Sequence, residues 1–139
     1  MAQGKETADE RYARGLATLE HALGDAGINH VKAFAGTAPE LARLIVEFPY
    51  GDIYSRPGLD AKTRQIVTIS ALAALGNAAP QLRVHIFGAL NVGVAKDEII
   101  EIFMQLAVYA GFPAALNAIL AAKEVFAEWD SRNVSTNIL

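Results

Sequence analysis

Two apolar segments between Pro57 and Asn91 constrain the fold of this chain most strongly, because a short Gly-Asn-Ala-Ala-Pro turn at residues 76–80 joins them. Each segment is long enough for a helix, and nowhere does the chain show the alternation of polar and apolar residues that is typical of strands. The second segment carries one histidine, His85, among apolar neighbours. The pair therefore predicts two central helices, which the rest of the chain buries while closing a pocket over His85.

The flanking segments also have helical periodicity. Tyr12, Leu16, Leu19 and Leu23 form one stripe of a helix from residue 8 to 24, and we expect Gly24 and Gly27 to end it. Further helices are expected around residues 31–34, from Pro39 to a bend or break at Pro49, and over residues 61–75, 77–91, 96–110 and 113–129. The predicted caps are Asp60, Gly76 and Asn77, and the predicted apolar face after Pro39 is Leu41, Leu44, Ile45 and Phe48.

These elements predict one all-α domain over residues 1–139, a bundle of about six helices with loose ends at about 1–7 and 131–139. Hydrophobic residues make up 53% of the chain and charged residues only 19%. A helical monomer of that composition exposes apolar surface, so we expect a homo-oligomer. No apolar run approaches the roughly 20 residues of a membrane span, and no apolar leader is present, so the cytoplasm is the expected location.

Charge and cysteine content exclude several classes of function. The net charge of −3 provides no basic surface for nucleic acid. The chain has no cysteine, which excludes thiol nucleophiles, redox CxxC motifs and cysteine-bound zinc. The other two histidines, His21 and His30, lack ligand spacing to His85, so no metal site is predicted.

His85 is the first candidate for chemistry, because an imidazole with an ordinary pKa near 6.5 exchanges protons at working pH. The alternative is a core histidine that a backbone carbonyl satisfies. Glu47 is a candidate general acid if a dry pocket raises its pKa, and otherwise a solvated glutamate at a helix end. Arg56, Arg64 and Arg83 are candidate carboxylate clamps, although Arg64 favours an ion pair with Glu101.

Aromatic and charged residues also gather in the stretch EFPYGDIYSRP at residues 47–57, which we expect to be a loop. Such loops often line sites, but its tyrosines can equally pack on the core of the protein. A second polar group, Glu98, Glu101, Gln105 and Tyr109, shares one helix face. That face is solvated by default, and Tyr109 is its member best placed to reach a pocket.

Several of these motifs resemble the gamma-carboxymuconolactone decarboxylase family, in the family's order and spacing over roughly residues 11–128. The motifs are EFPYGDIYSRPGLDAKTR at 47–64, ALAALG at 71–76, QLRVH at 81–85, GALN at 88–91 and QLAVYAGFPAALN at 105–117. The resemblance implies an AhpD-like helical fold and a trimeric or hexameric ring. It implies a cofactor-free lyase that converts 4-carboxymuconolactone to 3-oxoadipate enol-lactone in the degradation of aromatic compounds through protocatechuate.

The resemblance assigns His85 to the family histidine and places Glu47, Asp52, Arg56, Arg64 and Tyr109 at its polar positions. His85 and Glu47 are then the expected catalytic residues, and the other four, with Tyr54, are expected to bind a small carboxylated substrate. A sister branch of thiol peroxidases carries CxxC just before this histidine, where this chain reads NAAPQ at residues 77–81. The family pattern Cys-Trp-Gly-Glu followed by Trp is replaced here by Pro-Tyr-Gly-Asp at residues 49–52, followed by Tyr54.

Three functional hypotheses follow. In the first, the protein is a decarboxylase in which arginines hold the substrate carboxylates and His85 or Glu47 delivers a proton to carbon. In the second, which the altered loop favours, it is a non-catalytic oligomeric protein that binds a small molecule or acts as a scaffold. A different lyase or isomerase reaction on the same scaffold is the third possibility.

Overall fold

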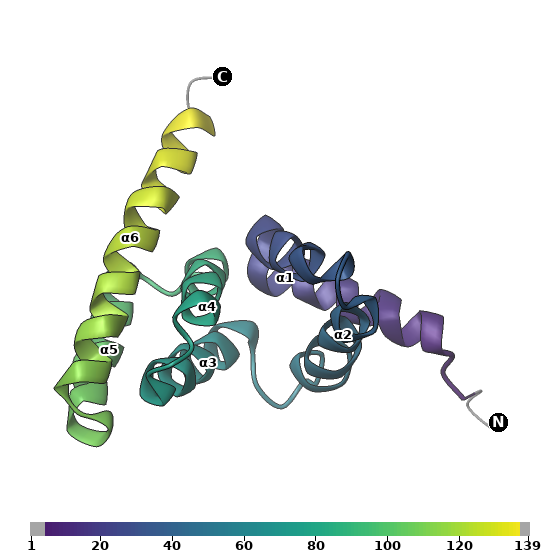
Figure 1. Cartoon of the computed structure of the whole chain (residues 1–139), viewed down its shortest axis with the longest axis horizontal. Coiled ribbons are helices and arrows are strands. Elements are labelled where there is room, and N and C mark those ends of the chain that lie inside the picture. Colours follow the sequence, from purple (N-terminus) through teal and green to yellow (C-terminus); the bar gives the residue numbers. More distant parts are fainter. Residues whose placement is uncertain (1–4, 137–139) are drawn as a thin grey trace.

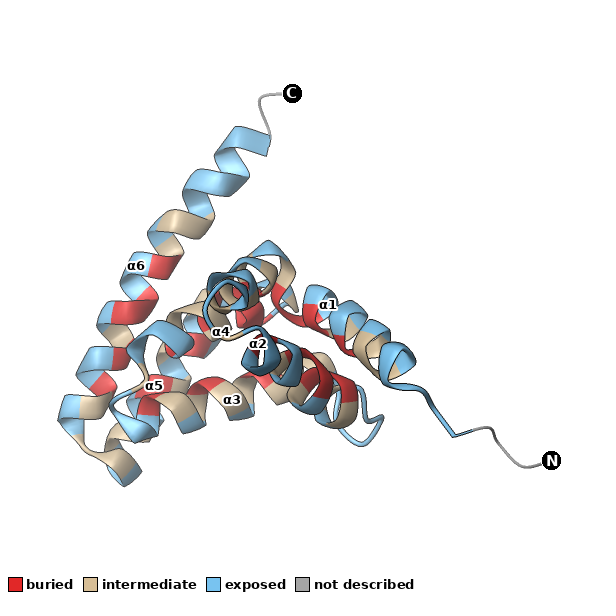
Figure 2. Cartoon of the chain, turned by 45° about the vertical axis from the view of Figure 1, so that its right-hand side comes forward, coloured by how far each residue is buried: buried red, intermediate tan, exposed pale blue. Residues whose placement is uncertain are grey.

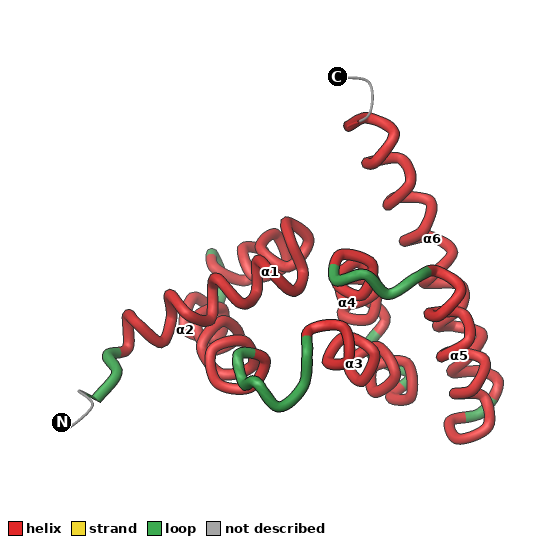
Figure 3. Tube along the Cα trace, turned by 180° about the vertical axis from the view of Figure 1, so that it is seen from behind, coloured by secondary structure: helices red, strands yellow, loops and turns green. Residues whose placement is uncertain are grey.

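The computed structural model describes residues 5–136, and the elements in this range are all helical, as the sequence predicts (Figures 1 and 3). They are α1 (Ala8–Ala35), α2 (Pro39–Ile45), the π-helix η1 (Val46–Tyr54), α3 (Ala61–Leu75), α4 (Ala79–Asn91), α5 (Lys96–Ala110) and α6 (Phe112–Thr136). None of the described helices is both long and apolar enough to cross a membrane.

The helices pack into two groups, one at each side of Figure 1. The first contains α1, α2 and η1 around the buried side chains of Leu19, Leu23 and Val46. The second contains α3 to α6 around a larger core that includes Ile69, Ile86 and Phe103. Helix α4 belongs to the second core but also packs along α1, so it joins the two groups, and buried residues line the surfaces between them (Figure 2).

Helix α1 begins at a capping box and changes direction at Gly24. Thr7 and Glu10 accept from each other's backbone N–H groups at its start. Gly24 has φ 58° and ψ −150°, a conformation that only glycine adopts readily, so the helical segment predicted for residues 8–24 does end there. The chain then resumes a helix to Ala35, so Gly27 does not end it. The amide of Asn91 donates to the carbonyl of His21 at 2.9 Å, just before this break.

Two predictions about residues 39–57 are wrong. Pro49 does not break the segment, because the backbone continues through it as the π-helix η1, and the expected loop is therefore helical up to Tyr54. In α2 and η1 the positions that turn toward α1 are Ala42 and Val46, both buried. Leu41, Leu44 and Phe48 consequently point outward and are at least half exposed.

The second group follows the predicted boundaries closely. Asp60 accepts from the backbone N–H of Thr63 at 2.7 Å, and Gly76 ends α3 in the left-handed conformation, as expected. Asn77 does not cap α4, which begins after Ala78 without a side-chain cap.

Residues 131–136 are helical rather than loose, because neither Gly nor Pro interrupts α6 there. Residues 5–7 are exposed and not helical, and Thr7 caps α1. Residues 1–4 and 137–139 lie outside the described residues.

Gly15 sets how closely α1 approaches η1, which generates a stability prediction. A Cβ atom at residue 15 would lie 2.2 Å from the carbonyl oxygen of Val46, and backbone cannot yield as a side-chain end does. We expect Gly15→Ala to lower the free energy of unfolding by about 2 kcal/mol or more, as overpacking of a close contact does. Gly36→Ala is the matched control, since a Cβ there meets nothing within 4 Å. Urea denaturation of both variants checks this, and equal stabilities would contradict it.

Candidate functional site

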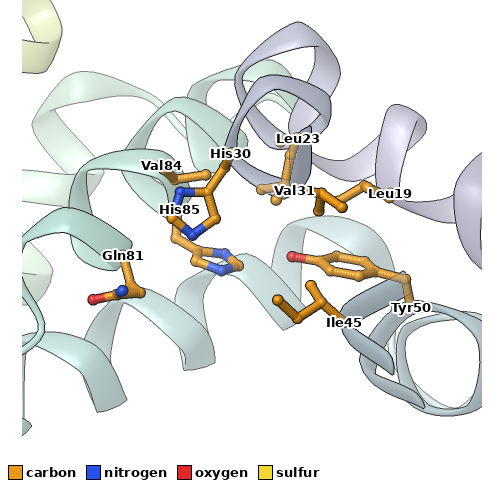
Figure 4. Close-up of a pocket in the computed structure, with 10 residues that line it drawn as sticks. Leu19, Leu23, His30, Val31, Ile45, Tyr50, Gln81, Val84 and His85 are labelled. Atoms are coloured by element: carbon orange, nitrogen blue, oxygen red, sulfur yellow. The ribbon is translucent and has the colours of Figure 1, made fainter. Parts of the chain in front are cut away.

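His85 lies on α4 at the boundary between the two groups of helices, facing α1 and η1 (Figure 4). Its neighbours Ile86, Phe87 and Ala89 are buried in the core of the second group. Their burial fixes the rotation of α4 about its axis, so that His85 faces the first group. A small cavity of about 30 Å³ lies beside the ring, with room for one or two water molecules. Its lining comes from three parts of the fold: Leu19, Leu23, Gly27, His30 and Val31 of α1, Ile45 and Tyr50 of the α2–η1 segment, and Gln81, Val84 and His85 of α4.

A buried glutamine orients the His85 ring. The Nδ1 atom of His85 lies 3.0 Å from Oε1 of Gln65, which projects from α3 and is fully buried. A carbonyl oxygen only accepts, so Nδ1 carries the hydrogen and Nε2 keeps its lone pair. The Nε2 amide group of Gln65 is buried without a partner. The side chain of Gln65 is therefore held by packing and by its hydrogen bond to His85. This hydrogen bond leaves Nε2 of His85 as the atom of the imidazole ring that can accept a hydrogen bond.

Burial favours the neutral forms of two groups in the cavity, His85 and Tyr50. Burial, with a smaller contribution from the nearby imidazole of His30, lowers the pKa of His85 to about 4. Burial also raises the pKa of the Tyr50 phenol well above its ordinary value, with a smaller contribution from Tyr54. The Tyr50 hydroxyl is directed toward His85, and the ring of His30 lies beside that of His85 (Figure 4). At neutral pH the cavity thus offers an imidazole acceptor and a phenolic donor.

Glu47 is buried, but it does not line this cavity. Its carboxylate binds Arg43, with Nε 2.6 Å from Oε1, and Arg11, with Nη1 3.5 Å from Oε2. The alternative of a solvated glutamate at a helix end is therefore wrong, since only 7% of the residue is exposed. The structure does not bring Glu47 and His85 together in one pocket.

Asp52 and Tyr54 are also engaged within the first group and its border with α3. Asp52 accepts from Arg11 at 3.0 and 2.5 Å and lies 3.4 Å from Arg14. The Tyr54 hydroxyl shares a hydrogen bond with the hydroxyl of Thr68, and its ring packs on Tyr50 at 5.0 Å between centroids. Tyr54 thus supports a residue of the cavity, whereas Asp52 contributes to an ion-pair network with α1.

The remaining predicted site residues lie away from the cavity. Arg64 donates to the carbonyl of Arg56 at 2.9 Å, in place of the ion pair with Glu101 that the sequence favoured. The side chain of Arg56 is on an exposed turn, and Tyr109 on α5 is 84% exposed. Of the seven predicted residues, only His85 lines the cavity in this chain. No cluster of three or more His, Cys, Asp or Glu side chains arranged for a metal occurs among residues 5–136.

Sequence reasoning missed Gln65, His30 and Tyr50 as parts of the site. A signal for Gln65 was present, because it shares one helical stripe with Ile69 and Ala73, and a lone polar residue on a buried stripe needs a partner. His30 similarly extends the stripe of Leu19, Leu23 and Gly27 across the break at Gly24. Tyr50 lies in the stretch 47–57, which the sequence indicated as lining a site or packing on the core, but the π-helix that directs its side chain was not predicted.

The partly buried His85 generates a prediction about pH. Its pKa in the folded state lies near 4, below its ordinary value of 6.5, so between these values the unfolded chain binds a proton that the native protein does not. The free energy of unfolding should therefore fall as the pH drops from about 6.5 to 4. At pH 4.5 we expect a loss of roughly 2 kcal/mol from this group alone.

Comparison with His85→Gln isolates this contribution, since glutamine does not titrate and the carboxylates remain common to both proteins. Urea denaturation at pH 7 and pH 4.5 should show a smaller loss for the variant than for the wild type. The same loss in both proteins would contradict a buried neutral imidazole.

Comparison with known proteins identifies relatives of this chain. A model of the carboxymuconolactone decarboxylase family matches residues 39–124. The chain is 37% identical to 4-carboxymuconolactone decarboxylase of Acinetobacter baylyi over 119 residues, which cover 85% of this chain and 88% of that protein. It is 38% identical over 101 residues to an uncharacterized 15.0 kDa protein of Paracoccus denitrificans, covering 72% and 75% of the two chains. It is also 37% identical over 82 residues to nitrosuccinic acid decarboxylase of Metarhizium robertsii, covering 58% and 56%.

Proposed function

The chain belongs to the carboxymuconolactone decarboxylase family, and from this premise we propose that it is a carbon–carbon lyase that releases CO₂ from a small carboxylated lactone. The substrate we propose is 4-carboxymuconolactone, which would give 3-oxoadipate enol-lactone during the breakdown of aromatic compounds. The observation that carries the proposal is the cavity in which the neutral His85, oriented by Gln65, faces the hydroxyl of Tyr50.

The two relatives that are named as decarboxylases support a substrate class. A lactone carbonyl and a nitro group each accept the electron pair that remains when a neighbouring carboxylate leaves as CO₂. A site for such acids needs a hydrogen-bond donor where the negative charge develops and a proton donor for the carbon. The phenol of Tyr50 is suited to the first role, because its raised pKa keeps the proton on oxygen.

His85 is suited to the second role once an anionic substrate is bound. Without substrate, the imidazole of His85 is neutral at pH 7. A substrate carboxylate beside the ring favours its charged form and raises the pKa of His85. The ring would then take up one proton at Nε2 and deliver it to carbon as CO₂ departs. The balance is one proton consumed for each CO₂ released, and no other co-reactant is needed.

Turnover of His85 variants tests this proposal. The wild type should consume 4-carboxymuconolactone in a spectrophotometric assay, and His85→Ala should lower kcat by about a hundredfold or more, as loss of a general acid does. Tyr50→Phe should lower kcat by a similar order. Glu47→Gln should lower the melting temperature through lost pairing with Arg11 and Arg43, while its folded fraction keeps most of its activity.

Full activity in His85→Ala would overturn the role of this residue. A wild-type protein that binds carboxymuconolactone without turnover would instead favour the non-catalytic binding protein. Parallel assay of nitrosuccinate separates the two substrates within the proposed class.

Exposed apolar side chains on α5 and α6 support the homo-oligomer that we propose as the working form. Several of them line a groove of about 350 Å³, including Val108 at 77% and Phe112 at 72% exposure. Tyr109, which follows Val108 on α5, is 84% exposed. The C-terminal half of α6 also extends beyond the other helices (Figures 1 and 2). Exposed apolar surface of this extent is typical of an interface, and we propose that a second copy covers it in a trimer or hexamer.

The oligomer generates its own prediction. Val108→Glu places a charge on the groove and should convert the trimer or hexamer to smaller species, because a charge desolvated at an interface is costly. Light scattering coupled to gel filtration measures the mass. Ala17→Glu, on an exposed position of α1, is the control and should leave the mass unchanged. A monomeric wild type would contradict the proposal.

A further inference from the structure

A second, open cleft adjoins the His85 cavity and has no role in the function described so far. It occupies about 500 Å³ between the second half of α1, the start of α4 and the C-terminal half of α6. His30 and Val84 line both spaces, so these two side chains form the partition between them. The cavity of about 30 Å³ is far too small for a carboxylated lactone, whereas the cleft lies within the range of about 300–1,000 Å³ that is usual for ligand sites.

Two guanidinium groups in the cleft are arranged around one carboxylate. Glu128 lies 2.9 Å from Nη2 of Arg132 and 3.6 Å from Nη2 of Arg83 through its two oxygens. Arg83 also pairs with Glu124, and the Arg132 guanidinium lies 4.8 Å above the ring of Phe87. Glu128 thus occupies the position between two arginines that a carboxylate of a ligand would take.

We propose that this cleft is the entrance and carboxylate-binding part of the site, where Arg83 and Arg132 hold one carboxylate of a dicarboxylate. The reacting carboxylate then passes between Val84 and His30 into the small cavity beside His85. The inference rests on the proposed decarboxylase function, since the ligand it assigns is the substrate of that enzyme. Glu128 competes with the ligand for the same guanidinium groups. Removing its charge therefore has the opposite effect from removing either arginine.

The single tryptophan of the chain reports binding independently of turnover. Trp129 packs 6.3 Å from Phe87 between ring centroids, and Phe87 lines the cleft. Titration with adipate, a dicarboxylate that cannot lose CO₂ under these conditions, should change the fluorescence of Trp129. Arg83→Gln and Arg132→Gln should each weaken adipate binding about fivefold or more, and Glu128→Gln should tighten it about threefold.

Lys123→Gln is the matched control, because it removes a positive charge from α6 about 180° around the helix from Arg132. It should change adipate affinity by less than about twofold, as expected for a screened surface charge. All these positions are at least partly exposed, so the variants should fold. Adipate that does not bind, or that binds all the variants equally, would overturn the proposal.

Changing the size of a side chain in the partition tests whether substrate passes through it. Val84→Phe should lower kcat/KM for carboxymuconolactone about tenfold by narrowing the passage, and this factor should exceed its effect on adipate affinity in the cleft. A melting curve of Val84→Phe verifies that the variant folds. A kcat/KM that is undiminished in Val84→Phe would contradict the proposal that substrate reaches His85 past Val84. If the wild type does not turn over the lactone, the proposed function fails, and the adipate series still decides whether the cleft binds carboxylates.

Discussion

The close approach of α4 to α1 and α3 is the constraint on which the site depends. Gly88 permits it, since a Cβ atom there would lie 2.2 Å from Cδ2 of Leu23 and 3.2 Å from the amide carbon of Gln65. One residue with no side chain therefore brings the two packing groups into contact and leaves space for the glutamine that orients His85. Because the same helix provides Ile86 and Phe87 to the larger core, the ring cannot shift without disturbing that core.

Polar residues of the chain serve two different purposes, and burial alone does not separate them. Glu47 and Asp52 join η1 to α1 through Arg11, Arg14 and Arg43, so their charges are compensated within the first group. Gln65 is fully buried but carries no charge, and it hydrogen-bonds to a group that can exchange a proton. A buried carboxylate with two guanidinium partners is suited to holding helices together, whereas a neutral amide can tune an imidazole without neutralising it.

Sequence periodicity predicted the second group of helices far better than the first. Asp60, Gly76, Gly111 and the apolar stripes around Ile69, Ile99 and Phe103 lie where local propensity and core burial agree, so the boundaries of α3 to α5 were predicted well. The π-helix η1 depends instead on packing against α1, and Pro49 and Gly51 within it read locally as a break. His85 was predicted because it is the single histidine of an apolar helix, while its partners come from segments distant in sequence.

The break at Gly24 divides α1 into an arm that anchors the first core and a shorter arm, residues 25–35, that carries His30. Asn91, at the end of α4, holds the carbonyl groups at this joint, and His85 lies on the same helix. Helix α4 thus contacts α1 at the break through Asn91 and also carries His85. The distance between the imidazoles of His85 and His30 therefore depends on how α4 packs against α1. A substitution of Asn91 would therefore change the direction of residues 25–35, and with it the position of His30 in the cavity, although Asn91 itself does not line the cavity.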